Sequence, residues 1–368
     1  MNPFDYLKAD SPAGAVAALA ATPAAAFVAG GTNLLDLWKY NLTHPAQLVD
    51  LNGLEELKTI TVLPDGGLRL GALVTNNTTA YHPLVRERYP LLSRTILAGA
   101  TAQIRNSATN GGNLLQRTRC YYFYDPASPC NKRQPGSGCP AIGGQNRLHA
   151  ILGQSESCIA THPSDMCVAL AALAAVVRVR GPEGERSIPI ADFHRLPGDR
   201  PEVDTTLGAD ELITSIDLPA RGFAAHHTYL KLRDRHSYAF ALVSVAIGYE
   251  LKDGEITTAR IALGGVAHKP WHVPEAEALL EGRAPTAEAF AAAADRLLVG
   301  ATGYEHNTFK IDLAHRAVIR AGLMALDPSC QLPGAPPAKF TPEAPAAWRP
   351  YPPPNPRSAA TAAVAKAT

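Results

Sequence analysis

The sequence of 368 residues lacks a long apolar run and an excess of either charge. No apolar stretch approaches the roughly 20 residues that cross a bilayer, so we expect no membrane span. Lysine and arginine (34) nearly balance aspartate and glutamate (33), and a net charge of +1 offers no general attraction to nucleic acid. The first residues, MNPFDYLKADSPAGAV, lack the charged and then apolar layout of a secretion signal. Any partner must therefore be inferred from local sites.

Several motifs that identify common enzyme classes are also missing. The sequence contains no Walker motif, no HExxH or H-x-x-E-H pattern and no nucleophile elbow. Its one match to G-x-G-x-x-G/A is GSGCPA at 136–141, but no strand precedes it and Pro140 stands where a helix should begin. We therefore expect neither a nicotinamide-binding Rossmann domain nor substrate chemistry on this chain.

Helices and strands alternate in the first part of the chain, and antiparallel strands follow. Ser11 has the character of an N-cap, and a β-α-β unit is expected from AFVAG (26–30) through LLDLWKY to QLVDL. The further expected elements are a strand at 68–74, helices near 83–98 and 164–175, the hairpin VVRVR-GPEG-RSIPI, three antiparallel strands after residue 220 with the turn KDGE (252–255), and helices near 286–299 and 308–325. From Gln331 the chain is rich in proline and alanine and cannot form a core.

Two glycine turns share one arrangement of residues. The segments VAGGTNL (28–34) and ATNGGNL (108–114) each place two glycines beside a small hydroxyl residue and an asparagine. Glycine lets the backbone turn tightly, so that successive N–H groups converge on an anion such as a pyrophosphate. One such turn is more typical of an ordinary loop, whereas two in one domain favour an anion site.

Five of the six cysteines lie between residues 117 and 167. The first four are Cys120, Cys130, Cys139 and Cys158. Their gaps of nine, eight and eighteen residues match neither C-x2-4-C zinc pairs nor the compact run of bacterial ferredoxins. From the spacing alone, a cluster held by four thiolates, two disulfides and free thiols all stay open. Cys167 falls on the apolar face of DMCVALAAL and is expected in the core, and Cys330 has no partner in reach.

Four segments resemble the FAD-binding subunits of the molybdenum hydroxylases, the family that includes xanthine dehydrogenase, carbon monoxide dehydrogenase and aldehyde oxidoreductases. They are AGGTNLLDLWK, ATNGGNL, HPSD (162–165) and YLKLRDR…FALVSVAIGY, and the resemblance runs from about residue 1 to 325. It implies an α+β fold, with a two-subdomain FAD-binding domain of the vanillyl-alcohol-oxidase (PCMH) type and a C-terminal three-stranded antiparallel sheet with a helix bundle. The implied parts are FAD-binding subdomains at 1–60 and 61–221, a C-terminal domain like that of the CO dehydrogenase flavoprotein at 222–328, and a Pro/Ala-rich tail at 329–368.

The resemblance also implies roles for individual residues at a FAD site. The expected residues are Val28, Ala29, Gly30, Gly31, Thr32, Asn33 and Leu34 of the first turn, and Ala108, Thr109, Gly111, Gly112 and Asn113 of the second. Asp165 matches a family aspartate near the ribityl and phosphate portion, and Ile213 and Lys231 fall where the family contacts the flavin ring. Without the resemblance, Lys231 would be a solvated strand lysine. Asn110 replaces an aliphatic residue of the family and is expected to contact the flavin or face solvent.

About forty residues, near 117–160, separate the second glycine turn from HPSD, where most of the family has almost none. An extra cluster in a comparable insertion is a feature of periplasmic aldehyde oxidoreductases and of 4-hydroxybenzoyl-CoA reductases. The resemblance therefore implies one [4Fe-4S] cluster with the metal ligands Cys120, Cys130, Cys139 and Cys158. The segments RCYYFYDPASPCNKRQPGSGC and NRLHAILG resemble the insertion of the aldehyde oxidoreductase branch.

The function implied by the resemblance is electron transfer in a molybdenum-containing aldehyde oxidoreductase. The implied partners are a large subunit with the molybdenum cofactor and a small subunit with two [2Fe-2S] clusters, and a non-covalent FAD on this chain would pass electrons to an external acceptor. The alternatives are the FAD/[4Fe-4S] subunit of a 4-hydroxybenzoyl-CoA reductase and a stand-alone flavin-binding redox module. Co-export with a signal-bearing partner would place the protein in the periplasm, and the cytoplasm is the alternative.

Overall fold

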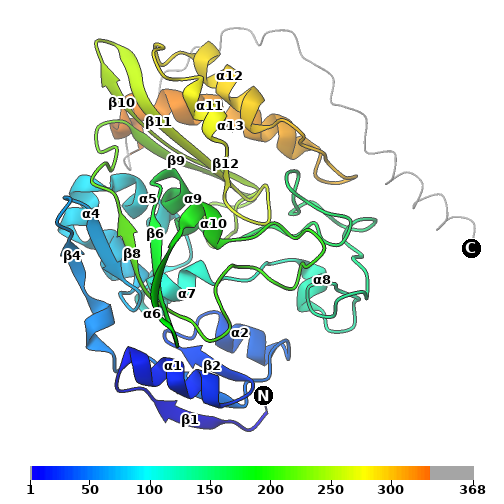
Figure 1. Cartoon of the computed structure of the whole chain (residues 1–368). Coiled ribbons are helices and arrows are strands. Elements are labelled where there is room, and N and C mark those ends of the chain that lie inside the picture. Colours follow the sequence, from blue (N-terminus) through cyan, green and yellow to red (C-terminus); the bar gives the residue numbers. More distant parts are fainter. Residues whose placement is uncertain (1, 332–368) are drawn as a thin grey trace, which may run out of the picture.

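The computed structural model describes residues 2–331, which form three sheets with helices packed around them (Figure 1). From residue 332 onward the expected tail, and with it the partner anchors that we expect at Phe340, Trp348 and Tyr351, lies outside the described residues. Within the described range, no helix combines the length and the apolar character needed to cross a membrane.

The N-terminal sheet is small and parallel. Its strands are β1 (Asp5–Lys8), β2 (Ala25–Val28) and β3 (Gln47–Asp50) in the order β1-β3-β2, with helices α1 (Pro12–Ala21) and α2 (Leu34–Lys39). The expected N-cap is confirmed, because the Ser11 hydroxyl accepts a hydrogen bond from the Gly14 amide at 3.1 Å. The β-α-β unit is also present, but β1 was not expected: it is exposed along its whole length and shows no apolar alternation.

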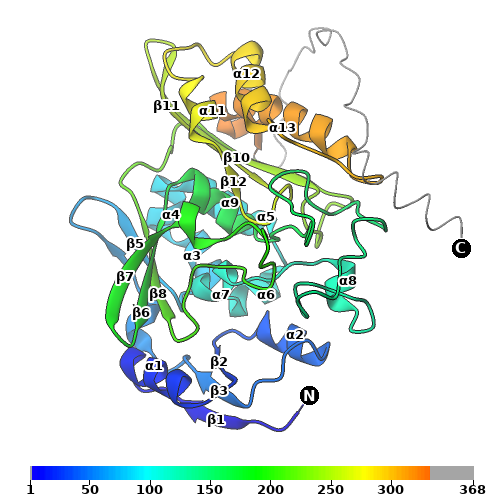
Figure 2. The same cartoon turned by 45° about the vertical axis from the view of Figure 1, so that its right-hand side comes forward.

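The middle part combines a five-stranded sheet with a group of short helices (Figure 2). The strands are β4 (Ile60–Val62), β5 (Leu68–Gly71), β6 (Val176–Gly181), β7 (Gly184–Pro189) and β8 (Leu212–Leu218), in the antiparallel order β4-β5-β8-β6-β7. The helices are η1 (Glu55–Lys58), α3 (Asn76–Tyr81), α4 (Pro83–Arg88), α5 (Pro90–Ala98), α6 (Ala102–Ser107), α7 (Asn110–Leu114), α9 (Asp165–Ala172) and α10 (Ile190–Phe193). The single helix expected near 83–98 is two helices, because Tyr89 leaves the helical conformation and Pro90 starts a new helix.

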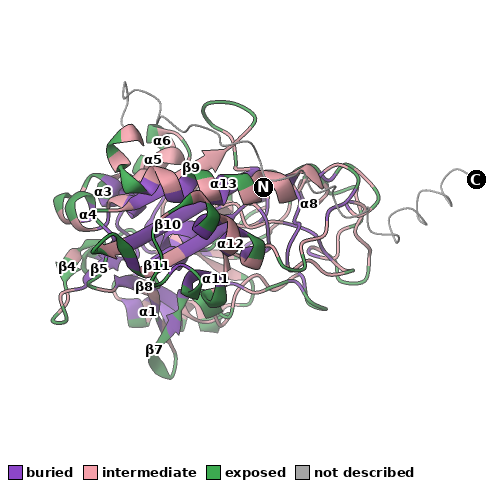
Figure 3. Cartoon of the chain, turned by 90° about the horizontal axis from the view of Figure 1, so that it is seen from above, coloured by how far each residue is buried: buried purple, intermediate pink, exposed green. Residues whose placement is uncertain are grey.

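The C-terminal part is an antiparallel sheet between two layers of helices. Its strands are β9 (His227–Leu232), β10 (Val243–Lys252), β11 (Glu255–Gly264) and β12 (Trp271–His272) in the order β12-β11-β10-β9, with helices α11 (Pro274–Ala278), α12 (Ala287–Leu297), α13 (Phe309–Leu326) and η2 (Pro328–Gln331). The sheet has four strands rather than the expected three, because the two-residue strand β12 pairs with β11. Helix α13 packs on β9 and β10 while α9 packs on β10 and β11, which buries the centre of the sheet (Figure 3).

The insertion at 117–160 has almost no regular structure. Its one short helix is α8 (Tyr121–Tyr124), and the rest is turns and loops, including the glycines of GSGCPA. Ile151 and Leu152 attach it to the C-terminal part, because both amides donate to the Val266 carbonyl and both side chains are buried in the C-terminal core. The insertion therefore lies alongside the other parts of the chain and packs against them (Figure 1).

Candidate cofactor sites

The two glycine turns lie against each other. The Asn33 side chain donates a hydrogen bond from Nδ2 to the Gly112 carbonyl at 2.9 Å. At Gly30 a Cβ would lie 1.8 Å from the Ser107 carbonyl oxygen, so only glycine lets the first turn approach α6. Gly31 has a φ of +71°, which other residues rarely adopt, and an open groove runs between this turn and α6. The first turn therefore borders an open groove that fits a pyrophosphate, while the second turn braces it, because the N–H groups of residues 110–113 all donate within the fold.

Asp165 and Lys231 form a buried ion pair beside the turns. Lys231 Nζ lies 2.7 Å from Asp165 Oδ2, and the two side chains are 5% and 10% exposed. The Tyr229 hydroxyl donates to the other carboxylate oxygen, and burial next to this carboxylate raises the Tyr229 pKa well above its usual value. The alternative of a solvated Lys231 is wrong, because strand β9 turns the side chain inward onto α9.

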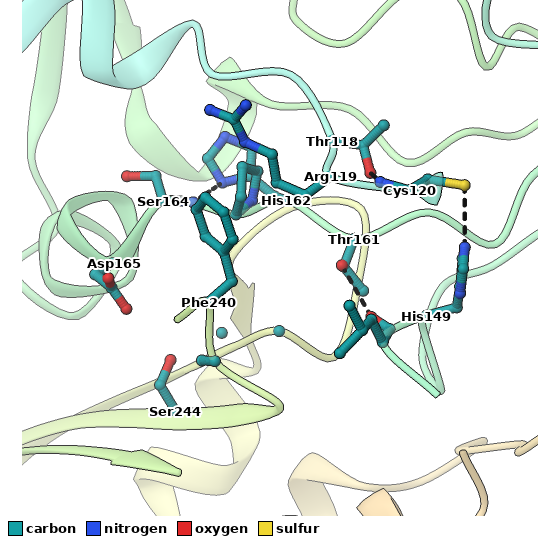
Figure 4. A pocket seen from close by; sticks show the side chains of 15 residues that line it. Thr118, Arg119, Cys120, His149, Thr161, His162, Ser164, Asp165, Phe240 and Ser244 are labelled. Carbon is teal, nitrogen blue, oxygen red and sulfur yellow. Dashed lines mark hydrogen bonds between the residues drawn. The ribbon is translucent and has the colours of Figure 1, made fainter. Parts of the chain in front are cut away.

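A small cavity of about 30 Å³ opens between this ion pair and the insertion (Figure 4). Asp165 and Ser244 lie at one end, Cys120 and His149 lie at the other, and the Phe240 ring lies between them. A concave, partly apolar site with a few converging polar groups is typical of cofactor sites. Its position next to Asp165 fits the expected flavin end of FAD.

The four cysteines expected as metal ligands line a second, narrower cavity, of about 10 Å³, inside the insertion. Backbone N–H groups point at the sulfurs of Cys120, Cys139 and Cys158, as they do around sulfurs that hold a metal. Burial raises the pKa of the Cys120 thiol to about 12 and that of Cys158 to about 11, so without a metal both sulfurs keep their protons at neutral pH. All six cysteines are free thiols, which disfavours the two disulfides. Four converging sulfurs fit a cubane cluster.

Ion pairs fasten the insertion to its neighbours. Asp204 accepts a hydrogen bond from Arg117 Nε at 2.8 Å and another from Lys132, whose side chain is 1% exposed. Burial alone would raise the pKa of Asp204, but the charges of Lys132 and Arg117 hold it at about 2. On the other side, Arg119 Nη1 lies 2.9 Å from Asp36 Oδ2 of α2. The insertion is therefore tied both to the first glycine turn and to the segment before β8.

Ile213 and Asn110 are both buried and line neither of the two cavities described above. Ile213 of β8 is 4% exposed and packs in the core, away from the two cavities described above, so its flavin contact stays a prediction. Asn110 is fully buried: Oδ1 accepts from Thr79 Oγ1 at 3.1 Å, and Nδ2 donates to the Gly71 carbonyl at 3.3 Å. Asn110 therefore braces the second turn, and both expectations for it, flavin contact and solvent exposure, are wrong.

Sequence reasoning missed the histidines near these cavities. His149 Nε2 lies 3.1 Å from Cys120 Sγ, and a separation of 29 residues gives no motif that signals this contact. His162, Cys167 and His194 offer ligand atoms within 4.8 Å of one another. Burial raises the pKa of the Cys167 thiol to about 12 and lowers both histidine pKa values, so the three side chains are neutral. We assign them no metal, and Cys167 lies in the core as expected.

Comparison with known protein families covers most of the chain. The model of the FAD binding domain in molybdopterin dehydrogenase matches residues 2–221, and that of the CO dehydrogenase flavoprotein C-terminal domain matches residues 227–321. The chain therefore belongs to the FAD-binding medium subunits of the molybdenum hydroxylases and is an oxidoreductase subunit.

Individual relatives show how similar the chain is to known subunits. The aldehyde oxidoreductase FAD-binding subunit PaoB of Escherichia coli K12 is 51% identical, over 86% of this chain and 96% of that protein. The glyceraldehyde dehydrogenase medium chain of Sulfolobus acidocaldarius is 27% identical, over 76% of this chain and 82% of that protein. Carbon monoxide dehydrogenase from Hydrogenophaga pseudoflava superposes with a TM-score of 0.69 at 27% identity, covering 88% of this chain and 98% of that chain. The expected mixed fold, a FAD-binding domain followed by a flavoprotein C-terminal domain, is confirmed.

Proposed function

We propose that this chain is the FAD-binding electron-transfer subunit of a molybdenum-containing aldehyde oxidoreductase, and that it carries a [4Fe-4S] cluster as well as FAD. The 51% identity to an aldehyde oxidoreductase subunit supports this branch of the family over the 4-hydroxybenzoyl-CoA reductases. The observation that carries the cluster is the convergence of Cys120, Cys130, Cys139 and Cys158 on one cavity, next to the cavity beside Asp165 where we expect the flavin.

The chain's own residues have separate tasks in this proposal. Gly30 and Gly31 would hold the pyrophosphate through backbone N–H groups, and the second turn would brace them through the hydrogen bond from Asn33 to Gly112. Asp165 would lie beside the ribityl and phosphate portion of a bound FAD, with its charge balanced by Lys231. Phe240 covers the cavity between its two ends and restricts water. Bound there, FAD would supply electron storage and the cluster would supply one-electron transfer.

The partners follow from the same proposal. A large subunit with the molybdenum cofactor would oxidise the aldehyde, and a small subunit with two [2Fe-2S] clusters would connect it to this chain. The carbon monoxide dehydrogenase from Hydrogenophaga pseudoflava, whose structure lacks the Mo-pyranopterin moiety of its molybdenum cofactor, supports such an assembly. We assign no catalytic residue to this chain, and its role ends with delivery of electrons to an external acceptor.

The test is to purify the full-length chain with the proteins that accompany it and to measure flavin, iron and molybdenum. We expect one FAD, released by acid because it is not covalently bound, and about four iron atoms per chain above those of the small subunit. Zinc in place of iron would exclude the cluster. A flavoprotein that purifies alone would favour the stand-alone module. Turnover of an aromatic CoA thioester instead of aldehydes would favour the reductase.

We further propose that the complex is exported to the periplasm on the signal of a partner subunit. Cell fractionation with and without that signal tests this. Retention of the complex in the cytoplasm with an intact signal would overturn the proposal.

A further inference from the structure

The wall between the two cavities is built from Cys120 and His149, which line both of them. His149 Nε2 lies 3.1 Å from Cys120 Sγ, and Figure 4 shows the imidazole directed at the sulfur. The His149 side chain is buried, and its other nitrogen, Nδ1, has no hydrogen-bond partner. Within the described residues, the imidazole of His149 therefore forms a hydrogen bond only with the sulfur of Cys120.

A metal on Cys120 decides which atom carries the hydrogen in this contact. A thiolate that binds a metal has no proton left, so the hydrogen must lie on Nε2 of His149 and point at the sulfur. Nδ1 then carries a lone pair, and no donor among the described residues forms a hydrogen bond with it. Hydrogen bonds to the sulfurs are among the factors that set the reduction potential of an iron–sulfur cluster, because they stabilise its more negative, reduced state.

The C-terminal domain holds His149 in this position. Lys310 of α13 donates from Nζ to the His149 carbonyl at 2.8 Å and to the Gly265 carbonyl at 2.5 Å. Asn307 donates from Nδ2 to the carbonyls of His149 and Ala150, at 3.2 and 3.1 Å. Both side chains are fully buried. Burial lowers the pKa of Lys310 to about 7, and a buried amine is costly unless it is hydrogen-bonded, so this contact fixes the backbone at His149 and at Gly265 in the wall of the first cavity.

We propose that His149 raises the reduction potential of the cluster by donating a hydrogen bond from Nε2 to Cys120, and that Asn307 and Lys310 are the positioning residues that aim it. The inference rests on the proposed [4Fe-4S] site. His149 thereby sets how readily an electron moves between the two cavities.

The test is a redox titration of the intact complex, followed by electron paramagnetic resonance of the cluster. His149→Phe removes the donor, and we expect the equilibrium constant for reduction of the cluster to fall about tenfold, a shift of about 59 mV to lower potential for one electron. His149→Gln keeps a donor at a similar reach and should recover most of the shift. His306→Phe is the matched control, because the His306 side chain contacts Gln145 and not a sulfur.

The outcomes separate this inference from the proposed function. A wild-type complex without the cluster signal would overturn the [4Fe-4S] site. A normal cluster with an unchanged potential in His149→Phe would overturn the role of His149 alone. Loss of the cluster in both His149 variants, with the control intact, would also overturn the inference. The hydrogen bond could not explain that loss, because glutamine retains the donor. Lys310→Met should lower the potential by less than His149→Phe, and an unchanged potential would remove Lys310 from the positioning role.

Discussion

The glycine turns and the cysteine insertion are the two proposed cofactor sites, but they are held in place differently. The turns lie on regular elements, and close backbone contacts define them: Gly30 against Ser107, and Asn33 against Gly112. The insertion contains one four-residue helix, and ion pairs at its edges attach it. Its interior includes the thiols of Cys120 and Cys158, which keep their protons unless a metal replaces them.

This difference separates a site formed by the backbone from a site that depends on its ligand. The cradle of the turns exists before FAD arrives, because its shape follows from glycine and from packing on α6. The insertion has four sulfurs at its centre and little regular structure, so a metal would crosslink it much as structural metals do in small domains. We therefore expect mutations to affect the two regions in different ways.

The largest effect is expected from Gly30→Val. The new side chain would overlap the Ser107 carbonyl, push the turn away from α6 and abolish FAD binding, at a cost of about 3 kcal/mol or more in stability. Flavin content of the purified protein measures this. The control is Gly136→Ala in the insertion, where a Cβ meets nothing within 4 Å. That control has a positive φ, so it should lose only about 1 kcal/mol and keep its FAD.

The second prediction concerns the ligand-dependent region. Cys139→Ser should lower the iron content by up to four atoms per chain and speed hydrogen exchange across residues 117–160, because the crosslink is lost. FAD should remain, since the turns lie outside the insertion. Cys167→Ala serves as the control and should leave the iron content unchanged, because Cys167 does not line the four-cysteine cavity. Equal loss of iron in both variants would contradict the assignment of the ligands.

A smaller effect is expected from Asp204→Asn, which leaves the buried ammonium of Lys132 without its carboxylate. We expect the free energy of local unfolding of the insertion, and of the segments that contact it, to fall by about 3 kcal/mol. Thermal unfolding together with hydrogen exchange would locate it. Glu202→Gln is the matched control, because its side chain pairs with the exposed Arg200, and it should change stability by less than about 0.5 kcal/mol.

The smallest effect is a pH dependence. The folded-state pKa of Asp204 is about 2, below its ordinary value of 3.8, so its stabilisation is complete above about pH 4 and is lost as the pH falls toward 2. This contributes up to about 2 kcal/mol in that range. Denaturant unfolding of the wild type and of Asp204→Asn between pH 2 and 5 should show two curves that converge at low pH. A constant separation would mean that Asp204 is not the group responsible.

The sequence predicted the local elements well where glycine, proline or alternation determines them. The hairpin at β6 and β7 and the turn at Asp253 and Gly254 follow from short-range rules, and both are present. Strands β1, β4, β8 and β12 were missed. Strand β1 is fully exposed and β4 and β12 have three and two residues, so these have no periodic pattern, and β8 is buried on both faces and does not alternate.

At the sites, the sequence indicated which residues to examine but not how they pair. The turns and the four cysteines were found from composition and resemblance, whereas the burial of Asn110 and the contact of His149 with Cys120 depend on long-range packing. Lys231 illustrates the limit: its position on a strand suggested solvent, and only the approach of α9 with Asp165 shows the buried pair.

Ile151 and Leu152 give the insertion a property that its position in the chain does not suggest. Since these two side chains are part of the C-terminal core, residues 117–160 cannot be exchanged between proteins as an independent cassette. Deleting the segment would open a hole in a domain more than 60 residues further along the chain, and grafting it onto a relative would require a matching recess there. The insertion and the C-terminal core therefore form one packed unit.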